Sequence, residues 1–247
     1  MACVWITRSE PGASIVGELL AAHGYAVINE SLIEIADLDP WHVCINGEMP
    51  SHDVGDLDLP DLLIVVSPHA VQALSQTSLL PSLVGIPCLA VGATTAKALV
   101  QYNISALVPE EETSEGLLAM LGHRTLGKDE QVWILAGVAG RGLIDQYLRD
   151  EMLVRVVKFE LYERINRVVD LASVERCDVI CFASVSAVTA CVANVVDQPD
   201  FATIFQRPVV VASQRIAHAA VGYGFVNVTL ATGASAQAML AAVQQVA

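Results

Sequence analysis

The sequence predicts an α/β protein with parallel sheets, built from two similar units. Short apolar runs of Val, Ile, Leu and Ala alternate with amphipathic helix patterns along the whole chain. Several segments also occur twice in the same order, which indicates one architectural unit used two times. The repeated pairs are 3–6 with 131–134, 61–71 with 178–188, 87–92 with 208–213, and 113–114 with 234–235.

The elements follow from the apolar spacing, in chain order. Residues 4–7 form an apolar run that predicts a strand, residues 11–23 have helical spacing, and residues 25–31 predict a second strand. Further elements of the first half are strands at 62–66, 88–91 and 105–108 and helices from about residues 69, 94 and 114. From residue 131 to residue 247 the same scheme returns, so each unit is expected to be αβ-layered in the same way.

Five strands per unit predict a doubly wound, flavodoxin-like sheet that binds ligands at the carboxyl ends of its strands. Polar joints at 36–60 and 166–175 each follow the second strand of a unit. Two tandem domains with one linker are the simplest arrangement, but two matching joints favour a crossed one. The expected domains are 1–36 with 171–247 and 37–170, with connecting segments near 37–60 and 160–172 and a central cleft for a large ligand.

Composition argues against a membrane-spanning protein and against a nucleic-acid-binding protein. The chain is 54% hydrophobic, yet no apolar run reaches the roughly 18 residues that a membrane span needs. The apolar excess lies in short runs, which is typical of parallel strands buried on both faces. The N-terminus lacks the layout of a secretory signal and leads directly into a strand, so a cytoplasmic protein is expected. A net charge of −14 argues against a nucleic-acid partner.

Metal and nucleotide sites have little support in the sequence. The six cysteines are scattered, and Cys177 and Cys181 lack zinc spacing and histidine partners. His42, Cys44 and His52 lie near one another in sequence without a recognised ligand spacing. The glycine-rich stretch 137–142 is not G-x-G-x-x-G, and the chain has no P-loop motif. No metal or cofactor is expected.

With these segments identified, the chain resembles the uroporphyrinogen-III synthase family over nearly its whole length. The residues that carry the resemblance are Thr7-Arg8, Ser67-Pro68-x-Ala70-Val71, Val91-Gly92-x-x-Thr95-Ala96, Pro109-x-x-x-Thr113-Ser114-Glu115-Gly116-Leu117, Gly140-Arg141 and Tyr162-x-Arg164. None is specific alone; their order and spacing are. The resemblance implies two flavodoxin-like domains with crossed connectivity. It also implies cyclisation of hydroxymethylbilane, a linear tetrapyrrole, with inversion of ring D.

Tyr162 is the expected catalytic residue, because the family places a tyrosine there facing the cleft. A phenol keeps its proton at neutral pH and can donate it to a leaving hydroxyl group. The structural alternative is an amphipathic tyrosine that caps the edge of a sheet. His69 stands where the family often has Asn, and only a contact role is expected for it.

Hydroxyl residues near the strand-to-helix turns are expected to bind substrate carboxylates, since helix N-termini offer N–H groups and a favourable dipole. Helix capping alone would explain the same residues. Arg8 and Arg141, which follow strands, are the expected cations, and Lys97, Arg164 and Arg215 are weaker candidates. The expected substrate-binding residues are Arg8, Ser67, Thr95, Ser114, Arg141, Ser184, Ser186 and Ser213.

The chain departs from the family pattern at Ile216, Val185 and Ala136, which weakens the transfer of binding residues to the C-terminal part. The alternative function is a non-enzymatic two-lobed protein that binds a small molecule. A signalling receiver is disfavoured because no phosphoacceptor Asp follows the strand that ends at Val66. A monomer is expected, with a transient contact to hydroxymethylbilane synthase as the only macromolecular partner.

Overall fold

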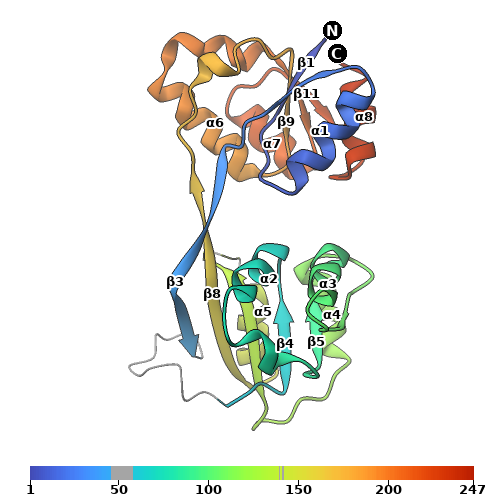
Figure 1. Ribbon diagram of the computed structural model, residues 1–247, viewed down its shortest axis with the longest axis vertical. Helices are drawn as coiled ribbons and strands as arrows, with labels where there is room; N and C mark the ends of the chain where they lie inside the picture. The colour runs from blue at the N-terminus through green and yellow to red at the C-terminus, as the bar shows by residue number, and fades with distance from the viewer. Residues whose placement is uncertain (46–57, 139, 141) are drawn as a thin grey trace. The chain divides into compact units, whose positions relative to one another are not determined.

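The computed structural model describes residues 1–45, 58–138, 140 and 142–247. The chain divides into two compact units. Unit 1 comprises Met1–Glu34 and Ile165–Ala247, and unit 2 comprises Ile35–Arg164. In Figure 1, unit 1 therefore combines the blue N-terminal segment with the orange and red C-terminal segments.

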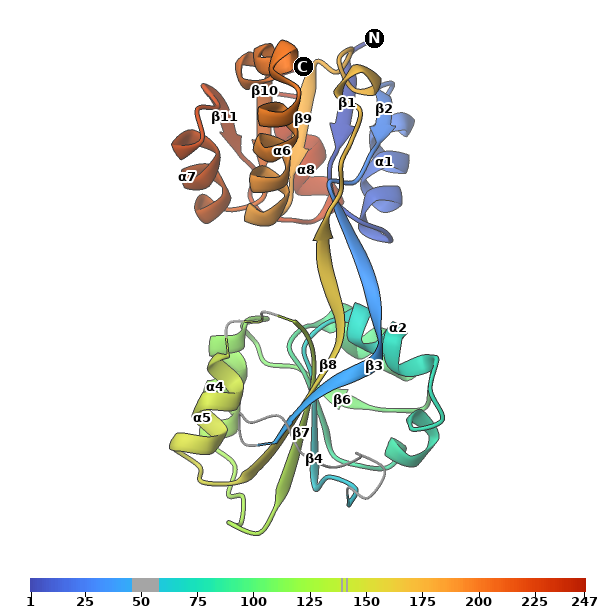
Figure 2. The ribbon, with the colours of Figure 1, turned by 90° about the vertical axis from the view of Figure 1, so that its left-hand side faces the viewer.

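Unit 1 is a five-stranded sheet in the order β11-β10-β9-β1-β2, in which all neighbouring strands pair in parallel. Counted along the unit, this is the 2-1-3-4-5 order of flavodoxin-like sheets. Helices α1 and α8 contact each other on one face, and α6 and α7 do so on the other (Figure 2). The elements are β1 (Cys3–Ile6), α1 (Gly12–Ala22), β2 (Ala26–Asn29), β9 (Val179–Phe182), α6 (Val185–Asp197), β10 (Pro208–Val211), α7 (Gln214–Gly222), β11 (Asn227–Leu230) and α8 (Ala236–Val243).

Unit 2 has the strand order β3-β8-β7-β4-β5-β6. Its five parallel strands, β8-β7-β4-β5-β6, repeat the spatial order β2-β1-β9-β10-β11 of unit 1. The first of them in sequence is β4, which corresponds to β9, the third strand of unit 1. Helices α2 and α3 contact each other, as do α4 and α5. The elements are β3 (Ile33–Ile45), β4 (Leu62–Val65), α2 (Pro68–Ser75), β5 (Cys88–Ala90), α3 (Ala93–Val100), β6 (Ala106–Leu107), α4 (Ser114–Gly122), β7 (Gln131–Gly137), α5 (Leu143–Asp150) and β8 (Arg155–Asn166).

Alternating side chains of the unit 2 strands fill two cores. Leu63 and Val65 of β4 pack with α2 and α3, whereas Leu62 and Ile64 pack with α4 and α5. Strands that are buried on both faces need apolar residues at every position, which explains the continuous Val/Ile/Leu runs. The predicted α/β class with parallel sheets is confirmed.

Each unit has the same aspartate contact at the amino ends of its central strands. In unit 1, the Asp178 N–H donates to the Cys3 carbonyl, and the Cys3 N–H donates to Asp178 Oδ2, both at 2.7 Å. In unit 2, the Asp61 N–H donates to the Gln131 carbonyl at 2.9 Å, and the Gln131 N–H donates to Asp61 Oδ2 at 2.8 Å. The internal repeat therefore extends to individual hydrogen bonds, and each aspartate fixes the first rung between two neighbouring strands.

The joint expected at 36–60 differs from the structure in its first part. Residues up to Ile45 continue β3 along β8, and Val43 is buried in the core beside α2. The sequence did not predict this strand, because it contains acidic residues and a proline. Such residues are tolerated here because β3 occupies the edge of the sheet. Residues 46–57 lie outside the described part of the chain.

Candidate active site

A β-bulge sets the direction of Tyr162. Ala136 of β7 pairs with Glu160, but Gly137 pairs with Tyr162, so Leu161 is an extra residue in β8. Strict alternation would send the residue after Leu161 to the opposite face, yet both side chains lie in the core beside α2. The bulge therefore turns the tyrosine toward the carboxyl end of β4. Tyr162 lies within β8, which runs on to Asn166.

The Tyr162 hydroxyl lies in a small hydrogen-bonded network. It is 2.9 Å from Ser67 Oγ, and the Arg164 Nη2 donates to it at 3.3 Å. Ser67 is the N-cap of α2 and also accepts the Ala70 N–H at 3.2 Å. Tyr162 is only 1% exposed, whereas Ser67 is half-buried. Of the two hydroxyl groups, that of Ser67 is therefore the more accessible to a ligand.

Gly137 and His69 lie next to the Tyr162 ring. A Cβ at Gly137 would lie 2.5 Å from Tyr162 Cζ, so only glycine leaves room for the ring there. The His69 ring lies 5.6 Å from the Tyr162 ring, between centroids. Burial lowers the pKa of His69 below its ordinary value, and the positive charge of Arg164 lowers this pKa further. His69 is thus a neutral neighbour of Tyr162 at pH 7.

The N-terminus of α3 lies at the carboxyl end of the neighbouring strand β5. Gly92 is the N-cap, in an extended conformation, and Thr95 in the first turn is only 3% exposed. The Glu112 carboxylate reaches this turn and accepts the Ala93 N–H at 2.9 Å. Ser114 is the first residue of α4, and the side chain of Thr113 caps that helix instead of Ser114.

Arg8 of unit 1 is a half-buried cation that follows β1. Its guanidinium group lies against Gly12, at the start of α1, where any Cβ would overlap it. It donates to the Ala234 carbonyl at 3.4 Å, and no described carboxylate forms an ion pair with it. Burial lowers the pKa of Arg8, because the charged form loses water contact. The guanidinium group stays charged at pH 7 and retains the capacity to bind an external carboxylate.

The serines expected in unit 1 differ in their roles. Ser184 is the N-cap of α6 and accepts the Ala187 N–H at 3.1 Å, as Ser67 does in α2. Ser186 is exposed in the first turn of α6. Ser213 is the N-cap of α7 without a side-chain cap bond. Ile216, the counterpart of Thr95 in the repeat, is buried and 3% exposed.

The two related units, each with polar residues at its strand-to-helix turns, match a known family. The family model described as "Uroporphyrinogen-III synthase HemD" matches residues 16–241. The chain belongs to the uroporphyrinogen-III synthase family. The resemblance inferred from the ordered motifs is thereby confirmed.

Solved structures agree with this family in fold. Uroporphyrinogen-III synthetase from Helicobacter pylori 26695 is 17% identical, with 100% of this chain and 99% of that chain covered and a TM-score of 0.65. A mutant uroporphyrinogen III synthase from the extremely thermophilic bacterium Thermus thermophilus is 14% identical, with 99% and 100% covered and a TM-score of 0.58. No curated protein sequence matches the chain.

The structure supports a substrate-binding role less clearly for the other expected cations than for Arg8. Arg141 lies outside the described residues. Lys97 and Arg215 are exposed, so a solvated surface role explains them. Arg164 is exposed as well, but it also contacts Tyr162, with its Cζ 5.4 Å from the ring centroid. No local sequence pattern marks Gly137 or Glu112, because both act through residues that are distant in sequence.

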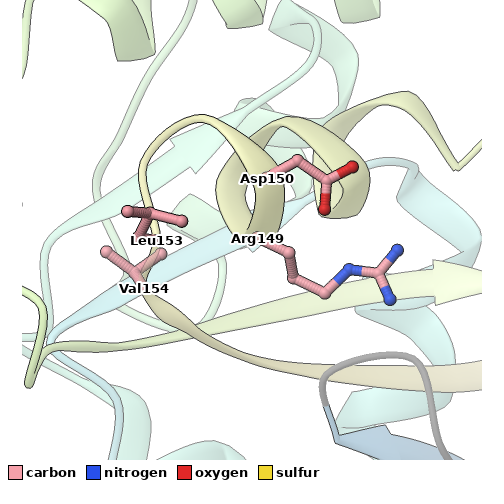
Figure 3. A pocket seen from close by; sticks show the side chains of 4 residues that line it. All are labelled: Arg149, Asp150, Leu153 and Val154. Carbon is pink, nitrogen blue, oxygen red and sulfur yellow. The ribbon is translucent and has the colours of Figure 1, made fainter.

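A surface hollow lies at the other end of the unit 2 sheet and is distinct from these residues. It is lined by Arg149 and Asp150 at the end of α5 and by Leu153 and Val154, which precede β8 (Figure 3). Ligands of doubly wound sheets bind at the carboxyl ends of the strands, whereas this hollow lies at the amino end of β8. Arg149 also pairs with Asp145 at 3.5 Å. We assign no function to the hollow.

Metal ligands, membrane helices and reactive thiols do not add to this site. Among the described residues, no group of three or more His, Cys, Asp or Glu could hold a metal ion. No helix in the described ranges is long and apolar enough to cross a membrane. Burial raises the pKa of Cys88, Cys181 and Cys191 to about 12 and that of Cys177 to about 11, so these thiols are unreactive.

Proposed function

We propose that this chain is a cyclising lyase that converts hydroxymethylbilane into uroporphyrinogen III, with inversion of ring D and loss of water. The observation that carries the proposal is the Ser67–Tyr162 hydrogen bond at the carboxyl end of β4, in a chain that belongs to the synthase family. The matching family and the similar solved structures are uroporphyrinogen-III synthases, and no observation favours a non-enzymatic binding protein.

The reaction needs one proton donor and firm control of geometry. The C–O bond to the terminal hydroxyl group breaks, the hydroxyl leaves as water after taking a proton, and the pyrrole nitrogen supplies the electrons. The substituted carbon of ring D, at the far end of the tetrapyrrole, then attacks the resulting azafulvene. The spiro intermediate then fragments and recloses, and loss of a proton restores the aromatic pyrrole. Because the pyrroles supply the electrons, the proposal requires no cofactor or metal.

Tyr162 and Ser67 are suited to supply that proton as a pair. The Ser67 oxygen accepts the Ala70 N–H, and the Tyr162 oxygen accepts the Arg164 N–H. One of the two hydroxyl protons lies between the oxygens, and the other is free to be donated. In the proposed step, Ser67 protonates the leaving hydroxyl group and takes up the Tyr162 proton across the 2.9 Å contact. Arg164 stabilises the phenolate that forms.

Substrate carboxylates are proposed to bind at helix N-termini and at Arg8. Arg8 is a half-buried cation of unit 1, with only a weak 3.4 Å bond to a carbonyl. The N–H groups of a first helical turn and their dipole attract anions even on an acidic protein. The proposed binding residues among those described are Arg8, Ser67, Thr95, Ser114, Ser184, Ser186 and Ser213.

Product analysis tests the proposal. Purified protein is added to freshly prepared hydroxymethylbilane, the products are oxidised, and the type I and type III isomers are separated by chromatography. A dominant type III product is expected, because spontaneous closure without inversion gives type I. Type I alone at the spontaneous rate would refute the proposed function.

The proposal also includes a cytoplasmic location and a monomeric state, together with a transient contact to hydroxymethylbilane synthase that hands over the unstable substrate. Light scattering of the purified chain measures the oligomeric state. Competition by an inert trap for free substrate, in an assay coupled to that synthase, measures the hand-over.

A further inference from the structure

The protein's own Glu112 carboxylate occupies the first turn of α3. Its Oε2 accepts the Ala93 N–H at 2.9 Å, and a Cβ at Gly92 would lie 2.7 Å from the same oxygen. Glu112 itself is exposed and has no cation paired with it among the described residues. Because the first N–H groups of a helix attract carboxylates, this contact has the geometry of a bound ligand carboxylate.

The loop before α4 holds Glu112 in this position. The Thr113 N–H donates to the Glu111 carbonyl at 2.7 Å, which makes a tight turn centred on Glu112. Any Cβ at Gly116 would overlap the Glu111 carbonyl, so the loop also packs closely on the first turn of α4. The turn thus positions the backbone of Glu112, whose exposed side chain accepts the Ala93 N–H.

Thr95 supplies a second and independent sign of a ligand. Its side chain is only 3% exposed, and no residue in the described part of the chain forms a hydrogen bond with its hydroxyl group. Thr95 lies in the same first turn of α3 as Ala93, whose N–H donates to Glu112. Its oxygen is not among the fully buried side-chain atoms without a partner, which in the described residues are Gln131 Oε1 and Trp133 Nε1, so a ligand can reach it.

The repeat shows that the fold does not require either feature. Ile216 occupies the position of Thr95 in unit 1 and is equally buried, without any hydroxyl group. The loop before Ser235 contains Gly233 and Ala234, so unit 1 has no carboxylate that corresponds to Glu112. The unpaired hydroxyl and the internal carboxylate therefore occur together, in unit 2 alone.

We propose that Glu112 is an internal competitor that occupies a carboxylate site formed by the first turn of α3 and Thr95. A carboxylate side chain of the tetrapyrrole displaces Glu112, takes over the Ala93 N–H and accepts the Thr95 hydroxyl. This inference rests on the proposed function for the identity of the ligand. It assigns to Glu112 a role in setting substrate affinity that is separate from the proton-donating pair.

Three variants test the competition. In Glu112→Gln the negative charge is lost, so the KM for hydroxymethylbilane should fall about two- to fivefold with unchanged kcat, as expected for a helix-terminus charge contact. Gly92→Ala places a methyl group where the carboxylate oxygen lies, so its KM should rise. Glu111→Gln is the matched control, since it removes the same charge from the adjacent exposed position. Its KM should stay near the wild-type value.

A purely structural role for Glu112 gives a different pattern. Glu112→Gln and Gly92→Ala would then lower the melting temperature and leave KM unchanged, which would refute the inference. An equal fall in KM for Glu112→Gln and Glu111→Gln would also refute it, by assigning the effect to net charge. If wild-type protein makes no type III product, the proposed function fails first. Titration with uroporphyrin III, a stable polycarboxylate, followed by fluorescence then tests the site: unchanged affinity in both Glu112→Gln and Gly92→Ala refutes it.

Discussion

Replacing Tyr162 by Phe should separate catalysis from stability. The substitution removes the hydrogen bonds to Ser67 Oγ (2.9 Å) and from Arg164 Nη2 (3.3 Å) while keeping the ring against Gly137. Losing a buried hydrogen bond costs about 1 kcal/mol of unfolding free energy. For a chain of this size the melting temperature should therefore fall by about 2–4 °C. Removal of a general acid should lower kcat by about 100-fold or more.

The same experiment distinguishes a relay from a tyrosine that acts alone. If Ser67 passes the Tyr162 proton to the substrate, Ser67→Ala should lower kcat as strongly as Tyr162→Phe. The double variant should then be no slower than either single variant, because both substitutions break the same path. If Tyr162 acts alone, Ser67→Ala should retain most of the activity.

Ser67→Ala also removes a helix cap, which costs about 1 kcal/mol by itself. Ser184→Ala is the structural match, because Ser184 caps α6 with a 3.1 Å bond and has no tyrosine at its hydroxyl group. The melting temperatures of the two variants should fall by similar amounts. Rates are measured from type III product formed in single-turnover mixtures. Unchanged kcat in Tyr162→Phe would refute the catalytic role of Tyr162.

Three further predictions concern stability and thiol reactivity. Folding lowers the pKa of His69, so the unfolded state binds a proton at this residue at higher pH than the folded state does. The free energy of unfolding should therefore decrease as pH falls below about 6.5. Urea titrations at several pH values should show a smaller decrease in His69→Gln. The raised pKa values of Cys88, Cys177, Cys181 and Cys191 predict that these thiols stay unmodified by iodoacetamide at pH 8 in native protein, as peptide mass spectrometry can verify. Asp178→Ala should lower the unfolding free energy by about 1.5 kcal/mol, and a wild-type urea midpoint would contradict the proposed strand contact.

Local patterns predicted the elements well, because strands and caps depend on nearby residues. Ser67 before Pro68 and Ser184 before Val185 both start helices as the turn chemistry suggests. The burial of Tyr162 could not be predicted, since it depends on the extra residue Leu161 in a pairing with a distant strand. Glu112 was missed for the same reason: its contact with Ala93 spans two loops that meet only in the folded sheet.

Duplication makes each unit a control for the other. Both units keep the aspartate contact between neighbouring central strands, at Asp61 and Asp178, so that contact belongs to the architecture. They differ at Thr95 and Ile216, and at Arg8 and Ala136. Each difference places a polar group in one unit at a position that the other fills with an apolar side chain. Positions where the fold accepts both are candidates for chemistry: the proposed substrate-binding cation Arg8 lies in unit 1, and the Thr95 hydroxyl lies in unit 2.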